Sequence, residues 1–346
     1  MDLAPWLARD GIGLDSFLAV TRVYTADGPK RWSLAMLADA YGLFWNREQL
    51  AAAGLDGPPT TISQLTDYAK RLTQRNPDGS LRVVGFNPLF GFYENAVGTF
   101  GHMFGARWND DLGQSSLASD PAWARMLAWQ KELVDWYGYD HLARFGREVG
   151  LEVSTANAFQ TGRLAMVVDG GWRVAMIAAQ AVGLDYGTSP VPVDDGRPGL
   201  YGSGYMNGTI IGIPAEATYK AESWRLVKYL ATDDRALAKL SNGLRNVPST
   251  LSALNSPDLV ADEHFSVFLD ISAHDGCTTT PMTTLGAQYQ DVVLTFLEEW
   301  QAGTASDLHA GLRAVDRQID AQLRQASRER RTGQGPGRAR SELAAS

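Results

Sequence analysis

The feature that most constrains the fold is a short apolar run that ends in an acid and two glycines. Residues 164–168 read Leu-Ala-Met-Val-Val, and such an uninterrupted run is typical of a strand covered on both faces. Gly162, just before it, fits the left-handed end of a helix. Asp169 and the two glycines follow, and helical spacing resumes at Trp172. This order predicts a helix, a buried strand, a tight turn and a second helix.

The other segments repeat this alternation, which indicates an α/β fold. Residues 31–45 are apolar around the single acid Asp39 and predict an extended segment, and residues 209–214 predict another buried strand. Helix-capping signals lie at Thr61 and at Asp120, which precedes a proline. In an open α/β sheet, ligands bind at the turns beyond the carboxyl ends of strands. We therefore expect a ligand beside the acidic and aromatic turn described above.

Composition excludes several kinds of site. Cys277 is the only cysteine, which rules out an internal disulfide and a multi-cysteine metal site. The five histidines form no HxxxH pair, and the sequence contains neither a Walker loop nor a dinucleotide fingerprint. We therefore expect no metal and no cofactor. The net charge of −8 disfavours nucleic acid as a partner, because phosphate binding needs a positive surface.

The two ends of the chain carry no clear structural signal. The start shows neither the basic nor the apolar region of a signal peptide. Residues 326–346 are rich in glycine and arginine without periodicity, so we expect a disordered tail.

Aromatic residues are abundant, and several lie next to small or polar residues. Examples are Tyr41 beside Asp39, Tyr93 beside Glu94, and Trp172 after two glycines. A pyranose stacks its C–H face on an aromatic ring, while its hydroxyls need donors and acceptors of fixed direction. These combinations favour a sugar as the ligand.

Four segments carry a resemblance to a known family. They read LADAYGLFWNREQLAAAGLDGPPTTISQLTDYAKRLT, NAFQTGRLAMVVDGGW, GTIIGIPAEATYKAESWRLVKYLATDDRALAKL and LRNVPS. Their content and order resemble the bacterial extracellular solute-binding proteins of carbohydrate ABC transporters, the maltose-binding-protein-like group. The resemblance extends over about residues 1 to 325.

The resemblance implies two α/β lobes joined by a hinge, as in periplasmic binding proteins. Lobe 1 would comprise residues 1–38 and 208–265, and lobe 2 residues 40–207 and 268–325. A sugar would be held between the lobes without catalysis and delivered to the permease subunits of an ABC importer. We expect the protein, when its first lobe is complete, to be a monomer located outside the cytoplasm, as a periplasmic protein or an anchored lipoprotein.

The resemblance also implies which residues bind the sugar. Asp39 matches an acid on the hinge strand, and Trp172 matches a stacking aromatic with Asp169 at the preceding strand end. The full predicted set is Asp39, Tyr41, Tyr93, Glu94, Asn95, Asp169, Gly170, Trp172, Tyr205, Asn207 and Tyr289.

Two other interpretations stay open. A carbohydrate-active enzyme would need two carboxylates across a cleft, and Asp39 with Asp169 or Glu94 are the candidate pairs. A sugar-free interaction module would consist of lobe 2 alone.

Members of the family carry further residues ahead of the point that matches Met1. We therefore expect lobe 1 to be incomplete. The strand at residues 209–213 would then have an uncovered edge, and the chain would associate through it.

Overall fold

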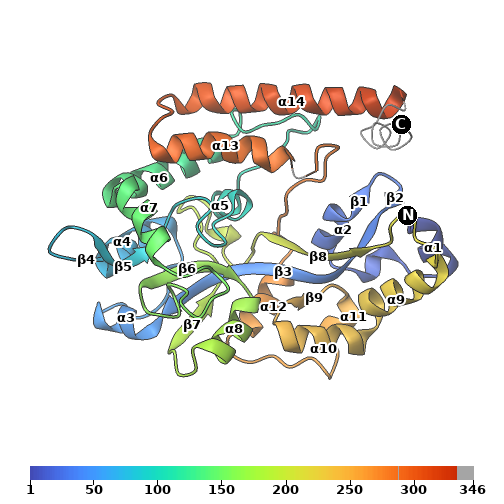
Figure 1. The fold of residues 1–346 in the computed structure, drawn as a ribbon, viewed down its shortest axis with the longest axis horizontal. Coiled ribbons are helices and arrows are strands. Elements are labelled where there is room, and N and C mark those ends of the chain that lie inside the picture. Colours follow the sequence, from blue (N-terminus) through green and yellow to red (C-terminus); the bar gives the residue numbers. More distant parts are fainter. Residues whose placement is uncertain (287, 333–346) are drawn as a thin grey trace, which may run out of the picture.

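The fold is organised around one long strand, β3 (Ser33–Asn46), in a computed structural model that describes residues 1–286 and 288–332 (Figure 1). Along its first half, β3 pairs with β8 (Met206–Gly212) and β9 (Val247–Pro248). Along its second half it pairs with β6 (Leu164–Gly170) and β7 (Tyr186–Ser189). All four pairings are antiparallel, so β3 belongs to both halves of the sheet.

The sheet extends beyond β6 through one parallel and one antiparallel pairing. β6 runs parallel to β5 (Leu81–Phe86), and β5 pairs antiparallel with β4 (Gln74–Arg75). Two short strands, β1 (Ala26–Asp27) and β2 (Lys30–Arg31), form a separate pair. The uninterrupted apolar run at residues 164–168 therefore forms a central strand, as predicted, and every residue of β6 is buried.

Helices surround this sheet, and α13 and α14 lie side by side in a layer at the top of Figure 1. The helices are α1 (Ala4–Arg9), α2 (Ala19–Tyr24), α3 (Arg47–Ala52), α4 (Ile62–Leu72), α5 (Val97–Phe104), α6 (Pro121–Tyr137), α7 (Tyr139–Glu148), α8 (Trp172–Gln180), α9 (Lys220–Thr232), α10 (Asp234–Leu244), α11 (Leu251–Leu254), α12 (Ser266–Ser272), α13 (Gln288–Ala302) and α14 (Leu308–Thr332). None of the helices in the described part of the chain is long and apolar enough to cross a membrane.

The capping signals in the sequence mark real helix ends. The side chain of Thr61 accepts a hydrogen bond from the backbone N–H of Gln64 at the start of α4, and Asp120 caps α6 in the same way. Such caps satisfy donors that have no partner within the helix. Gly162 has φ of +72°, so its left-handed backbone is confirmed, but the predicted helix ahead of β6 is wrong, because residues 158–162 form turns.

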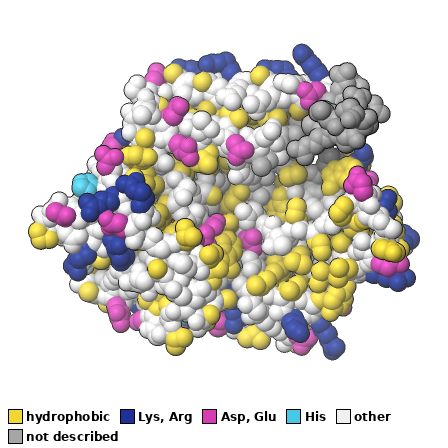
Figure 2. Space-filling model, in the orientation of Figure 1, with side chains coloured by type: hydrophobic (Ala, Val, Ile, Leu, Met, Phe, Trp, Pro, Cys, Tyr) yellow, Lys and Arg dark blue, Asp and Glu magenta, His cyan; other side chains and the backbone are white. Residues whose placement is uncertain are grey.

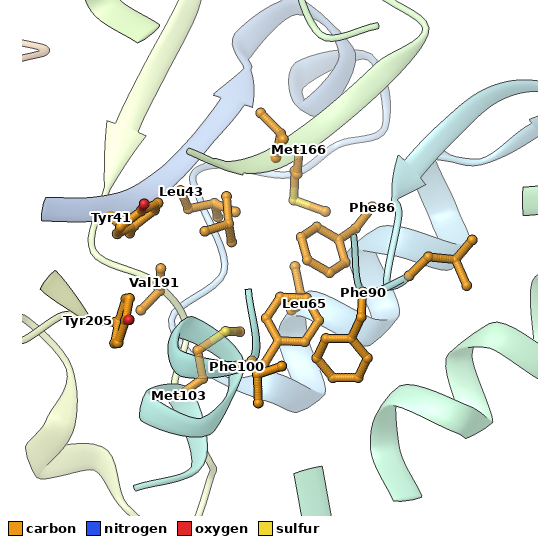
Figure 3. Close-up of a cluster of buried hydrophobic side chains, with 14 of the residues drawn as sticks. Tyr41, Leu43, Leu65, Phe86, Phe90, Phe100, Met103, Met166, Val191 and Tyr205 are labelled. Carbon is orange, nitrogen blue, oxygen red and sulfur yellow. The ribbon is translucent and has the colours of Figure 1, made fainter. Parts of the chain in front are cut away.

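The buried apolar residues form separate clusters, as in a two-lobed protein. The larger cluster fills the space around β5, β6 and the second half of β3, and Figure 3 shows part of it, with Tyr41 and Tyr205 at one side. A second cluster packs Leu3 and Phe17 against Trp224 of α9. Because β3 exchanges its partners between Ala40 and Tyr41, we retain the predicted lobe boundaries as a proposal.

Two further sequence-based expectations differ from the structure. The strand at residues 209–214 is not buried: Ile210 is 51% exposed. In the described part of the chain β8 has only β3 as a strand partner, so its other edge is unpaired. The chain is also helical beyond residue 325, because α14 continues to Thr332. The rest of the predicted disordered tail, residues 333–346, lies outside the described residues.

We expect the open edge of β8 to promote association between molecules, because unpaired strand edges that carry exposed apolar side chains pair with other chains. Ile210→Lys should lower the tendency to associate and the binding of a dye for apolar surface, without loss of stability. Sedimentation velocity over a range of protein concentrations measures this. Val182→Lys removes an even more exposed apolar side chain, outside any strand, and serves as the control. A parent protein that stays monomeric and dye-negative would contradict the expectation.

Candidate functional site

Several of the predicted site residues converge where β3 changes partners. Asp39 and Tyr41 are two positions apart on β3 and therefore project from the same face of the strand. Asp39 is in register with Asn207 of β8, and Tyr41 is in register with Gly170 at the end of β6. This pairing brings segments that are more than 100 residues apart in the sequence to one place.

Tyr41 is the centre of the polar contacts. Its hydroxyl donates to Oε2 of Glu94 at 3.2 Å and accepts from Nδ2 of Asn207 at 3.2 Å. The ring of Trp172 meets the Tyr41 ring edge to face, with centroids 5.5 Å apart, and Tyr205 packs on it at 5.8 Å. Polar groups and aromatic rings of the kind that bind sugars thus lie together at the middle of β3.

The two glycines ahead of Trp172 are required by close packing. A Cβ on Gly170 would lie 1.9 Å from the Trp172 ring, and one on Gly171 would lie 2.4 Å from the carbonyl oxygen of Arg245. No side chain fits at such distances, so the glycines allow the indole ring to fold back against the end of β6. This explains the sequence that follows the apolar run.

A buried arginine holds this turn in place. The side chain of Arg173 is 0% exposed, and its Nε donates to Asp169 at 2.6 Å. Its Nη2 donates to Oε1 of Glu152 at 3.2 Å, and the same oxygen accepts from Nε1 of Trp172 at 3.3 Å. Arg173 therefore ties the loop that contains Glu152 to the start of α8, and the Trp172 ring is fixed by that connection.

Asp169 does not reach the site surface, contrary to expectation. Its carboxylate is buried, bonded to Arg173 and to the backbone N–H of Gly170 at 2.8 Å. A carboxylate engaged in this way positions its neighbours and is not free to accept from a ligand. Its pairing with Asp39 as the two carboxylates of an enzyme therefore has no support in the geometry.

The side chains of three more predicted site residues make hydrogen bonds within the protein. The hydroxyl of Tyr93 donates to the carbonyl of Gly150 and accepts from the backbone of Ala158. Asn95 is buried and donates to two backbone carbonyls. Tyr289 of α13 is wholly buried, and its hydroxyl donates to Asn109 at 2.8 Å. The structure does not bring these side chains to Tyr41.

Glu94 and Asp39, the carboxyl groups that remain near Tyr41, have raised pKa values. Burial, followed by the negative charge of Glu152, raises the pKa of Glu94 from 4.5 to about 8. Burial also raises the pKa of Asp39 to about 6, and its hydrogen bond from Asn246 opposes the rise. At neutral pH Glu94 therefore holds a proton in most molecules.

Sequence reasoning missed several residues of the site. Glu152 lies in a loop without periodicity, so no local signal marks it. Arg173 is four positions after Asp169, a spacing at which side chains meet on a helix, and this was the one available signal. Asn246 lies within the family-like stretch LRNVPS. In the residues that the structure describes, no cluster of acidic, histidine or cysteine side chains is arranged to hold a metal ion.

Removing Arg173 should destabilise the protein strongly, because the buried Asp169 and the partly exposed Glu152 would lose the one cation bonded to them in the described part of the chain. We expect Arg173→Met to lower the free energy of unfolding by about 3–5 kcal/mol, measured by denaturant titration. Arg144→Met breaks the exposed pair with Glu148 and should cost less than about 1 kcal/mol. Equal losses in the two variants would contradict the importance of the buried ion pairs.

Glu94 should also make stability depend on pH. Between pH 4.5 and about 8 the folded protein keeps a proton that the unfolded chain releases, so stability falls as pH rises through this range. Glu94→Gln removes this loss, and the variant should be more stable than the parent at pH 8 but not at pH 4. Melting temperatures at both pH values measure the effect. Glu132→Gln, at a 76% exposed side chain, should match the parent at each pH.

Comparisons with known proteins identify the family of the chain. A family model described as bacterial extracellular solute-binding protein matches residues 15–267. The maltotriose-binding protein of Pyrococcus abyssi is 26% identical over 106 residues, which are 30% of this chain and 23% of that protein. A putative binding protein of Brucella abortus is 22% identical over 213 residues, 59% of this chain and 47% of that protein. The matches thus span less than half the length of these curated relatives.

Solved structures show the same fold. The structure of CpMnBP1 with mannotriose bound has a TM-score of 0.80 at 21% identity, covering 92% of this chain and 80% of that chain. The sugar-binding protein MalE of Xanthomonas citri has a TM-score of 0.70 at 19% identity, covering 97% of this chain and 81% of that chain. The fold is therefore that of the two-lobed binding proteins. Since the family model matches well over half of the sequence, the chain belongs to the bacterial extracellular solute-binding proteins.

Proposed function

We propose that the protein binds a sugar or oligosaccharide on the face of β3 that carries Asp39 and Tyr41. The observation that supports this most directly is the meeting of Tyr41, Trp172 and Glu94 at the point where β3 changes partners. A ligand there contacts residues of both halves of the protein. Closure of the two lobes around it then provides the ligand-dependent change of shape that a transport component needs.

The chemistry of the site supports a sugar over other small molecules. The Trp172 ring is only partly buried, so part of it is available to a sugar face, and Asn207 and Glu94 offer donors and acceptors beside it. The relatives named above include proteins that bind maltotriose and mannotriose, which is consistent with this ligand class.

The proposal is for binding without catalysis. The carboxylate of Asp169 is bonded to Arg173. Of the two carboxylate pairs considered for an enzyme, Asp39 with Glu94 therefore remains. The family consists of binding proteins, and this supports delivery of the sugar to the permease subunits of an ABC importer outside the cytoplasm. A monomeric state, once the edge of β8 is covered, is part of the same proposal.

Truncation of Trp172 should weaken binding more than it weakens the fold. Loss of ring stacking in Trp172→Ala should lower the affinity about tenfold to a hundredfold. Isothermal titration calorimetry with maltotriose and mannotriose, beside thermal melts, measures both effects. Trp136→Ala removes another partly exposed indole, on α6, and should leave the affinity unchanged.

Two results would contradict the proposal. One is a Trp172→Ala protein that melts far below the parent yet binds with the parental affinity when folded. The other is release of new reducing ends from the oligosaccharide during the titration, lost in Asp39→Asn, because turnover would show an enzyme.

A further inference from the structure

Helix α14 carries a row of arginines on its outer side, far from the face of β3 described above. Arg313, Arg317, Arg324 and Arg328 all have exposed side chains. An α-helix turns by about 100° per residue, so their spacing places all four within an arc of about 60° around the helix. In Figure 2 basic side chains lie along the top edge of the molecule, where Figure 1 places α14. We call these four residues the arginine row.

The opposite side of α14 is packed against the rest of the protein. Leu312, Val315 and Ile319 are buried in the larger apolar cluster, and α14 lies against α13. These apolar side chains point about 150° away from the arginine row. The helix is therefore anchored by one side and presents the arginines on the other, at the top edge of the described part of the molecule in Figure 1.

The acids of α14 do not neutralise the arginine row. Asp316 and Asp320 are the acids beside it on the helix, and both accept hydrogen bonds from the loop at residues 115–118. The first three arginines of the row form no ion pair or hydrogen bond with any residue that the structure describes. The helix contains six arginines and three acids, whereas the whole chain has a net charge of −8. The row is thus a local positive surface on an acidic protein.

A hollow lies beside the second half of the arginine row. Its volume is about 410 Å³, and the residues that line it include Arg324, Arg328, Ser327 and Gln114. Asp320 also lines it, but its carboxylate is bonded to the loop named above. A guanidinium presents several N–H donors in one plane, which suits the oxygens of a phosphate group. The hollow therefore has both the room and the donors for one phosphate-bearing headgroup.

From this charge distribution we propose that the arginine row docks on a membrane surface that contains anionic phospholipids, with a headgroup phosphate in the hollow beside Arg324. The row extends over about 22 Å along the helix, and such a line of charges matches the flat, diffuse negative charge of a bilayer. The family of the chain is extracellular, where a lipid surface is a nearer partner than a nucleic acid. The inference goes beyond the proposed function and needs no sugar on β3.

Flotation of the full chain with lipid vesicles measures this docking. One set of vesicles contains equal amounts of phosphatidylglycerol and phosphatidylcholine, and the other contains phosphatidylcholine alone. We expect binding to the anionic vesicles only, and weaker binding as salt is added, because salt screens exposed charges. The triple variant Arg313→Gln, Arg317→Gln, Arg324→Gln should bind about a hundredfold more weakly, because each arginine near an anionic surface adds to the attraction.

A matched triple variant separates the arginine row from net charge. Arg147→Gln, Arg225→Gln and Arg235→Gln remove the same charge from exposed positions on α7, α9 and α10, and this variant should bind the vesicles as the parent does. Thermal melts check that both variants fold. The inference is overturned if the parent ignores anionic vesicles, if both variants lose binding equally, or if the parent prefers a DNA duplex to the vesicles. The row variant should keep the parental affinity for sugar, so either proposal can fail without the other.

Discussion

The rest of the structure depends on one strand that serves two parts of the protein. β3 is 14 residues long and is hydrogen-bonded to β8 and β9 in one half and to β6 and β7 in the other. Because side chains alternate along a strand, this pairing fixes which residues share a face, and it places Asp39 and Tyr41 together at the exchange of partners. A shift of one residue in register would turn both away from Glu94 and Asn207.

The second constraint is the buried ion-pair group around Arg173. Burial of charged side chains such as Arg173 and Asp169 is costly unless each is paired, and here one guanidinium bonds two carboxylates from different segments. The same group positions the Trp172 ring through Glu152, so stability and binding geometry depend on shared contacts. Glu94 lies near this group, and its pKa is raised first by its own burial and then by the negative charge of Glu152.

Local patterns in the sequence predicted most of the fold, and the resemblance predicted part of the site. The apolar run of β6, the caps at Thr61 and Asp120, and Gly170 before Trp172 each depend on neighbouring residues alone. Gly171, in contrast, is required by the backbone of the distant Arg245. The positions of the Asp169 and Tyr289 side chains could not be predicted in this way. Asp169 is bonded to the buried Arg173, and Tyr289 is bonded to a residue far away in the sequence. The hydroxyl of Tyr289, for example, meets Asn109, which is 180 positions away in the sequence. The exposure of β8 likewise depends on which strands flank it.

The central claim is that a saccharide lies on the β3 face between the two lobes. The most direct measurement is a crystal structure of the protein with a bound trisaccharide. The account predicts a sugar ring stacked on Trp172, with polar groups of the ligand bonded to Asp39, Glu94 and Asn207. The account would be contradicted by a sugar that is bound elsewhere while the β3 face is unoccupied. One such place is the cavity of about 550 Å³ lined by Phe17, Leu254 and Leu269.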